Sequence, residues 1–222
     1  MKTLGNVVVI GDSYSTYKGY IPANYGAYYS DEGSERTDVN KVEQTWWHSL
    51  ITETGSALLY NSSWSGATIC NTGYDGKDFS HCSFVSRIDE LIEKRFFEEN
   101  KVDTVFVVGG TNDSWSNAPL GEVKLSRWTR EDLYSVLPAI AYMFDRLKNN
   151  TSSDTKIYMV LNSSNLKAPM IELFETLSEK HGFGCIPVPV IDKKCSHPTI
   201  QGMQDIKNTI LKYINEQDQH DI

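Results

Sequence analysis

Five short apolar runs are spaced along the chain, and longer segments with a helical repeat separate them. Three of these runs consist almost entirely of Val, Ile, Phe, Met and Leu, a pattern typical of strands whose two faces are both covered in a parallel sheet. The pattern therefore predicts five strands, at residues 6–10, 57–61, 104–108, 156–161 and 185–190.

The segments between these runs place apolar residues at helical spacing. They predict helices within residues 45–55, 83–100, 129–150, 168–182 and 197–214. The third has Thr129 and Asp132 in a capping-box arrangement, and Pro138 is expected to bend it. Pro198 is expected in the first turn of the last helix.

Strands that alternate with helices predict a three-layer α/β/α sandwich around a five-stranded parallel sheet, with right-handed crossovers. At 222 residues, the chain is expected to form a single domain over residues 1–222. Residues 17–44 and 109–128 lack periodicity and are expected to be long loops. Loops of that length in a compact domain usually carry function.

Composition narrows the possible partners. The net charge of −8 argues against nucleic acid or an anionic membrane as the main partner, because both require a basic surface. No apolar run approaches the roughly 18 residues of a membrane span, so no membrane insertion is expected. We expect a cytoplasmic protein, or a secreted one if a leader peptide was removed. The four cysteines show no zinc-binding spacing and are expected to be idle thiols rather than disulfides: Cys70, Cys82, Cys185 and Cys195.

Residues that could take part in catalysis follow four of the five predicted strands. Ser13 follows the first strand, Gly66 lies beyond the second and Asn112 comes after the third, whereas Asp192 and His197 follow the fifth. In open α/β sheets, the carboxyl ends of the strands form the ligand-binding edge. A serine, a small-residue turn, an amide and a histidine at one edge supply a nucleophile, oxyanion donors and a base, which is the inventory for acyl transfer.

The order of these motifs resembles the four blocks of the SGNH (GDSL-like) hydrolases. The blocks are GDSYS at residues 11–15, the lone turn glycine Gly66, GTND at residues 110–113, and the pair His197 and Pro198. The resemblance spans residues 11 to 198 and implies a flavodoxin-like SGNH hydrolase fold without metal or cofactor. It also implies that Ser13 is the nucleophile and His197 the base. The oxyanion hole would consist of the Ser13 and Gly66 backbone N–H groups and the Asn112 amide.

The sequence departs from the family pattern at the acid that orients the histidine. The family's acid lies three residues before the histidine, where this chain has Lys194. The nearest carboxylate is Asp192, five residues before His197. Asp192 is therefore the first candidate for the acid, and a backbone carbonyl completing a Ser–His dyad is the second.

Several residues also fit other interpretations. Ser13 and Asn112 are common capping or turn residues, and Asp113 is expected to be structural. His81, in a loop, is the main alternative base, because the other rivals, His48, His181 and His220, lie within a helix, at a helix end and in the tail. Cys195 lies close to His197 in sequence, but a thiol nucleophile is less favoured there than an idle thiol.

Aromatic residues accompany the predicted site. Half of the chain's twelve tyrosines fall between residues 14 and 29, directly after Ser13. Rings with polar edges suit flat polyhydroxylated substrates, which makes five side chains candidates for substrate binding: Tyr14, Tyr17, Tyr20, Trp64 and Trp115. The alternative is that these rings only pin the loop to the body.

The sequence thus predicts a serine esterase that hydrolyses carboxylic esters, most simply a small acyl group such as acetyl on a carbohydrate. The expected partner is a small-molecule or carbohydrate ester substrate, and the oligomeric state is open. Lysophospholipase, thioesterase and acyltransferase activities are the enzymatic alternatives. A catalytically silent carbohydrate-binding protein is the alternative from another class.

Overall fold

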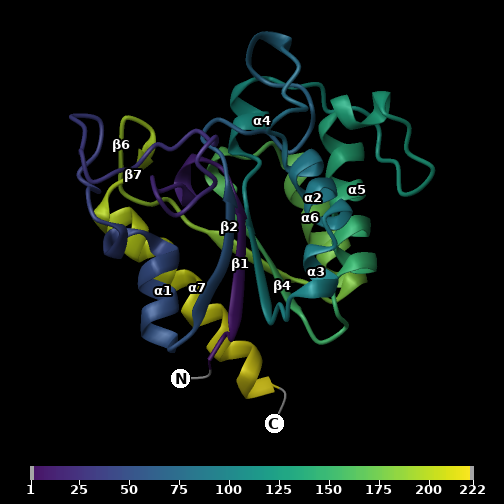
Figure 1. Cartoon of the computed structure of the whole chain (residues 1–222). Coiled ribbons are helices and arrows are strands. Elements are labelled where there is room, and N and C mark those ends of the chain that lie inside the picture. Colours follow the sequence, from purple (N-terminus) through teal and green to yellow (C-terminus); the bar gives the residue numbers. More distant parts are fainter. Residues whose placement is uncertain (1–2, 221–222) are drawn as a thin grey trace.

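Five parallel strands form the central sheet of the computed structural model, which describes residues 3–220 apart from the side chains of residues 218 and 220 (Figure 1). The strands are β1 (Asn6–Gly11), β2 (Ala57–Ser63), β3 (Thr104–Val108), β4 (Lys156–Asn162) and β5 (Gly184–Val188). Their order across the sheet is β2-β1-β3-β4-β5. This is the flavodoxin-like order, so the three-layer fold expected from the sequence is confirmed.

Helices cover both faces of the sheet (Figure 1). On one face lie α1 (Trp46–Thr54) and α7 (Ile200–His220), and on the other α2 (Phe84–Glu93), α3 (Phe96–Glu99), α5 (Val136–Asn150) and α6 (Ala168–His181). The central strand β3 is buried along its whole length, which explains why its apolar run is continuous. The short helix α4 (Thr111–Trp115) follows directly after β3.

Short elements complete the structure. Single 3₁₀ turns are η1 (Ser13–Ser15), η2 (Val42–Gln44), η3 (Tyr74–Gly76), η4 (Glu131–Tyr134) and η5 (Ser163–Asn165). The strands β6 (Lys193–Lys194) and β7 (His197–Pro198) pair antiparallel in a small hairpin. This hairpin, η1 and α4 all lie at the carboxyl ends of the sheet strands.

The helix expected over residues 129–150 differs from the prediction. Thr129 and Asp132 do form the reciprocal capping box, but it closes only the turn η4. Ser135 is then extended, and α5 begins at Val136. Pro138 consequently lies in the first turn of α5, where a backbone N–H has no carbonyl of the same helix to bond. Its missing N–H therefore breaks no hydrogen bond of the helix, and Pro138 does not bend it.

Two further helix boundaries were predicted incorrectly. The second helix is interrupted at Arg95, whose φ of 56° is left-handed, and α3 then starts afresh. The last helix begins at Ile200 instead of including Pro198 in its first turn. Pro198 lies in β7 instead, so the histidine before it sits on a hairpin rather than at a helix end.

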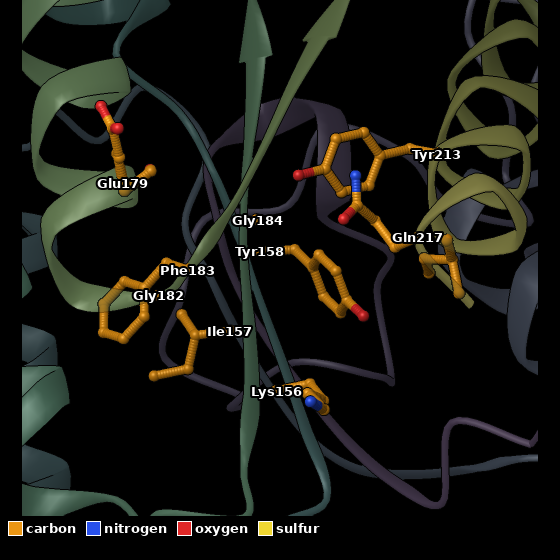
Figure 2. A pocket seen from close by; sticks show the side chains of 11 residues that line it. Lys156, Ile157, Tyr158, Glu179, Gly182, Phe183, Gly184, Tyr213 and Gln217 are labelled. Carbon is orange, nitrogen blue, oxygen red and sulfur yellow. The ribbon is translucent and has the colours of Figure 1, made fainter. Parts of the chain in front are cut away.

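A hollow of about 300 Å³ opens at the opposite end of the sheet, between α6 and α7 (Figure 2). Its lining includes Lys156 and Gly184, the first residues of β4 and β5. Ser178 also belongs to the lining, but no histidine does. Because β4 and β5 run away from this hollow toward the carboxyl edge, it is separate from the motifs described above.

Within residues 3–220, no helix has both the length and the apolar character required to cross a bilayer.

Candidate active site

The GDS motif forms a tight turn at the end of β1. Gly11 is required there because a Cβ at this position would come within 2.6 Å of the Ser15 and Ser63 side chains. The buried Asp12 carboxylate accepts a hydrogen bond of 3.0 Å from the backbone N–H of Tyr14 and caps the turn η1. Burial raises the pKa of Asp12 to about 7. These constraints fix Ser13, the first residue of the turn, at the edge of the sheet.

A buried arginine ties the ends of β1 and β2 together beneath this turn. Arg87 of α2 is 2% exposed and donates hydrogen bonds to the carbonyl oxygens of Gly11, Ser62 and Cys82. Burial lowers its pKa to about 10, so it remains a cation at neutral pH. The carbonyl dipoles, together with the charge of Asp12, offset the cost of burying this cation.

His197 approaches Ser13 from the β6–β7 hairpin. Its Nε2 lies 2.9 Å from the Ser13 Oγ, although 184 residues separate the two in the chain. The two residues of the hairpin turn, Cys195 and Ser196, have φ values of 47° and 65°. Both are therefore left-handed, as a type I′ turn requires, and neither is the glycine or asparagine that usually occupies such positions. Backbone strain at this turn accompanies the placement of His197.

The other ring nitrogen of His197 faces the backbone rather than a carboxylate. Its Nδ1 lies 3.0 Å from the carbonyl oxygen of Cys195. The Asp192 carboxylate instead accepts a hydrogen bond of 2.5 Å from the Thr199 hydroxyl. The structure thus corrects the expected position of Asp192: the two-residue turn is too short to loop its carboxylate back to the ring, and the carbonyl of Cys195 occupies that place.

Three tyrosines of the loop after Ser13 hold the histidine hairpin. The Tyr28 ring stacks on His197 with the ring centroids 3.5 Å apart and an interplanar angle of 8°. The Tyr14 hydroxyl donates to the Ser196 carbonyl oxygen at 2.8 Å, and the Tyr29 hydroxyl donates to that of Pro198 at 3.0 Å. The run of tyrosines after the serine therefore fastens the hairpin that carries the histidine against that serine.

The surroundings of His197 favour its neutral form. Burial lowers its pKa below the ordinary value, the Cys195 carbonyl acts in the opposite direction, and the positive charges of Arg36 and Lys193 lower the pKa further. Lys193 lies over the Tyr14 ring, with its Nζ 5.5 Å from the centroid. A neutral imidazole whose Nδ1–H donates to the Cys195 carbonyl leaves the Nε2 lone pair facing the serine hydroxyl.

The donors expected at the oxyanion hole lie on neighbouring turns. Gly66 has a φ of 83°, a conformation that favours glycine. The Asn112 amide nitrogen donates to the carbonyl oxygen of Ala67 at 2.9 Å, which places Asn112 beside the Gly66 turn. Within residues 3–220, the backbone N–H groups of Ser13 and Gly66 donate to no protein acceptor. They are thus available to a ligand oxygen.

Asp113 has the structural position expected from the sequence. Its fully buried carboxylate accepts hydrogen bonds from the backbone N–H groups of Ile69 and Cys70, at 2.9–3.1 Å. Burial raises its pKa to about 6. Asp113 thereby joins α4, which carries Asn112, to the segment after Gly66.

The aromatic residues expected to bind substrate are only partly exposed. Tyr14 and Tyr17 are 3% and 1% exposed, so the structure corrects their expected place on a substrate platform. Tyr20 is 44% exposed but packs against Trp47 and His48 of α1. Burial excludes the first two rings from contact with a substrate.

Each tryptophan candidate lies on a segment that carries an expected oxyanion donor: Trp64 is two residues before Gly66, and Trp115 is on α4 with Asn112. The Trp64 ring packs against Tyr25 in a tilted arrangement with the ring centroids 4.3 Å apart, and Trp115 at the end of α4 is 40% exposed. Their role in substrate binding stays a prediction.

Among the described histidine side chains, only that of His197 hydrogen-bonds to the Ser13 hydroxyl. His81 contacts the rings of Trp64 and Phe79, whereas His48 and His181 contact rings beside α1 and α6. The side chain of His220 falls outside the part of the chain that is described. All four cysteines are free thiols, and Cys195 is exposed at the hairpin turn. Among the described residues, no group of three or more His, Cys, Asp or Glu side chains is arranged to hold a metal ion.

The family follows from a match along almost the whole chain. The model of the family described as GDSL-like lipase/acylhydrolase matches residues 5–214. The chain belongs to this family. Among curated protein sequences, none matches the chain.

Several solved structures resemble the chain along almost its whole length. A protein from Bacteroides ovatus ATCC 8483, assigned to the GDSL-like lipases, is 39% identical with a TM-score of 0.88, covering 97% of this chain and 100% of its own. A second, from Bacteroides uniformis ATCC 8492, is 37% identical with a TM-score of 0.86, covering 96% of each chain. Est24, a carbohydrate acetylesterase from Sinorhizobium meliloti, shares the fold at 13% identity and a TM-score of 0.63, covering 96% of this chain and 99% of its own.

Sequence reasoning missed two side chains at the site of this GDSL-like protein. Tyr28 stacks on His197, and the Tyr74 hydroxyl donates to the Asn112 Oδ1 at 2.7 Å. Tyr28 has no distinguishing signal among six neighbouring tyrosines. Tyr74 directly precedes Asp75 and Gly76, and Asp-Gly is a strong signal for a tight hairpin turn. That signal locates the turn but not the contact across it.

Proposed function

We propose that this GDSL-like protein is a serine esterase that removes small acyl groups, such as acetyl, from carbohydrate esters. The single observation that carries the proposal is the hydrogen bond of 2.9 Å between the Ser13 Oγ and the His197 Nε2, at the carboxyl edge of the sheet. A hydroxyl in contact with a neutral imidazole is an activated nucleophile.

The proposed reaction proceeds through an acyl-enzyme. The Ser13 Oγ attacks the ester carbonyl carbon while its proton passes to the His197 Nε2. The carbonyl oxygen becomes an oxyanion that the Asn112 amide and the free N–H groups of Ser13 and Gly66 stabilise. The intermediate then collapses as His197 returns the proton to the departing alcohol. A water molecule, deprotonated by His197, releases the carboxylic acid and restores Ser13.

In this proposal the Ser–His pair acts as a dyad. The Cys195 carbonyl accepts the Nδ1 proton and so selects the tautomer that leaves Nε2 free to act as the base. When the imidazolium forms, the carbonyl dipole and the face of the Tyr28 ring stabilise its charge. Asp192 takes no direct part.

The polar surroundings of the site support a small acyl group on a sugar. The aromatic side chains in contact with His197 and Asn112 are all tyrosines, whereas a long acyl chain needs a continuous aliphatic groove. The fold shared with a carbohydrate acetylesterase is consistent with this choice. Lysophospholipase, thioesterase and acyltransferase activities are the alternatives that a substrate panel distinguishes.

A serine-reactive fluorophosphonate probe tests the enzyme class. Covalent labelling of the wild-type protein and its loss in Ser13→Ala are expected, together with the loss of nearly all activity on p-nitrophenyl acetate. Ser65→Ala, close to Gly66 but outside the proposed reaction, is the matched control. A Ser13→Ala variant that kept most of its turnover would overturn the nucleophile assignment. If the wild-type protein bound sugars but did not react with the fluorophosphonate probe, the result would support the alternative of a catalytically silent carbohydrate-binding protein.

A panel of esters tests the substrate class. Acetylated sugars are expected to be hydrolysed with a higher kcat/KM than octanoyl or longer esters, thioesters and lysophospholipids. A clear preference for long acyl chains would contradict the carbohydrate assignment and leave the serine mechanism intact. Acyl transfer to an added alcohol in preference to water would favour the acyltransferase.

A further inference from the structure

Both ends of the Asn112 amide are fixed by hydrogen bonds, and the side chain is only 4% exposed. The amide nitrogen donates to the Ala67 carbonyl oxygen at 2.9 Å, and the Oδ1 accepts from the Tyr74 hydroxyl at 2.7 Å. A carbonyl oxygen only accepts, so the amide nitrogen must face Ala67 and Oδ1 must face Tyr74. Tyr74 is therefore the donor in its contact, and the second amide N–H has no acceptor among the described residues.

We infer that Tyr74 is a positioning residue that aligns and polarises the Asn112 amide for the oxyanion of the proposed esterase reaction. This inference rests on the proposed function and extends it to a residue outside the four sequence blocks. A hydrogen bond to the amide oxygen draws electron density away from the nitrogen, and the free N–H becomes a stronger donor. The gain is largest when the substrate oxygen carries a full negative charge.

The segment that carries Tyr74 is held rigidly. Tyr74 starts a tight turn in which Asp75 and Gly76 have φ values of 59° and 70°, and the Lys77 N–H donates to the Tyr74 carbonyl at 3.2 Å. The Gly73 N–H bonds back to the Lys77 carbonyl at 2.8 Å. This loop lies beyond the carboxyl ends of the strands, next to α4 (Figure 1). A turn locked on both sides presents the phenol in one position.

Neighbouring contacts tie the same turn to the body of the protein. The Thr72 hydroxyl donates to the Tyr134 carbonyl oxygen at 2.7 Å, and a Cβ at Gly73 would collide with the Phe79 ring. Burial raises the pKa of Tyr74, so its hydroxyl stays protonated at neutral pH. The hydroxyl can thus act as a donor at neutral pH.

Tyr74→Phe tests the inference because it removes only the hydroxyl. We expect kcat on an acetyl ester to fall roughly three- to tenfold, the effect of one hydrogen bond felt mainly in the transition state, with KM within about twofold. Affinity for a boronic acid that mimics the tetrahedral intermediate should fall by the same factor. The melting temperature should change little, because the ring and its packing remain.

Two comparisons separate this role from a structural one. In an Asn112→Ala background, Tyr74→Phe should have no further effect on kcat, because the amide through which it acts is gone. Tyr142→Phe is the matched control: its hydroxyl bonds to Asp89 on the helical layer, at 2.9–3.0 Å. This control should lower stability and leave kcat unchanged.

Each contrary result has a defined meaning. A higher KM at unchanged kcat would make Tyr74 a substrate-binding ring and overturn the inference. An equal loss of kcat with and without the Asn112 amide would also overturn it. If Ser13→Ala still removes activity while Tyr74→Phe has no effect, only the role of Tyr74 fails. If Ser13→Ala keeps its activity, the proposed function itself fails.

Discussion

The Nδ1 of His197 lies 3.0 Å from the carbonyl oxygen of Cys195, a residue two positions earlier in the same hairpin. The group that faces the second ring nitrogen of the histidine is thus part of the backbone, and its position is set by the geometry of one tight turn. Lys194, at the position of the family's usual acid, pairs with His197 across the hairpin ladder instead. Because this acceptor belongs to the backbone, substitutions of side chains around His197 are expected to affect activity differently than they would beside a carboxylate.

Asp192→Asn should reduce kcat/KM by less than about tenfold, because the carboxylate bonds to Thr199 and an amide oxygen can still accept that bond. A carboxylate that oriented the base directly would cost about 10⁴-fold in kcat when converted to an amide. Steady-state kinetics on an acetyl ester, with His197→Ala as the inactive reference, distinguish the two. A loss of several orders of magnitude would return Asp192 to the site.

Removal of the Tyr28 ring should impair the base. We expect Tyr28→Ala to lower kcat about tenfold, since a stacked ring contributes on the order of 1 kcal/mol to holding the imidazole. Tyr28→Phe keeps the ring and should retain most of the activity. If both variants lost activity equally, the hydroxyl rather than the stacking would be responsible.

The hairpin turn should tolerate residues that prefer its backbone conformation. Replacing Cys195 by Asn and Ser196 by Gly should raise the free energy of unfolding by about 1–2 kcal/mol, because Asn and Gly adopt the left-handed conformation of this turn at a lower energetic cost. Activity should persist, since both functional contacts use backbone carbonyls. Denaturant unfolding and kcat measure the two effects. A more stable but inactive double variant would implicate the Cys195 or Ser196 side chain in the reaction.

The acidic limb of kcat/KM should lie below pH 6.5, the ordinary pKa of histidine. In the proposed mechanism, His197 must be neutral to accept the Ser13 proton, and a lowered pKa keeps it neutral at lower pH. Arg36 is one of the charges that lower this pKa, so Arg36→Gln should move the limb to higher pH. A pH–rate profile of each protein provides the test. A wild-type limb well above pH 6.5 would indicate a carboxylate beside the imidazole.

Asp113 should matter for stability. Asp113→Ala leaves the buried N–H groups of Ile69 and Cys70 without acceptors, and we expect the free energy of unfolding to fall by about 2–4 kcal/mol. Asp154→Ala, at an exposed position, is the control and should change stability by less than about 0.5 kcal/mol. Similar unfolding curves for the two variants would show that other groups satisfy these N–H donors.

The periodicity of the sequence predicted the elements that position the site. The strand at Thr104–Val108 has the predicted bounds. Three others, β1, β2 and β4, begin as predicted and end one or two residues later, whereas β5 begins one residue and ends two residues earlier than predicted. Helix starts were predicted less well around Pro138 and Pro198, because a proline near a helix start fits the first turn, a bend or the preceding segment equally well.

The sequence by itself determined the sheet, its carboxyl edge and the set of polar residues gathered there. These depend on buried apolar runs and on strand direction, which are local properties of the chain. Only the tertiary structure decided which group faces the second nitrogen of His197, which tyrosines are buried, and that Tyr74 reaches Asn112. A cysteine–serine turn carries no local signal for a left-handed backbone, since both residues normally favour negative φ. Contacts between Ser13 and His197, or Tyr74 and Asn112, join segments 184 and 38 residues apart, and their geometry is fixed by how whole elements pack.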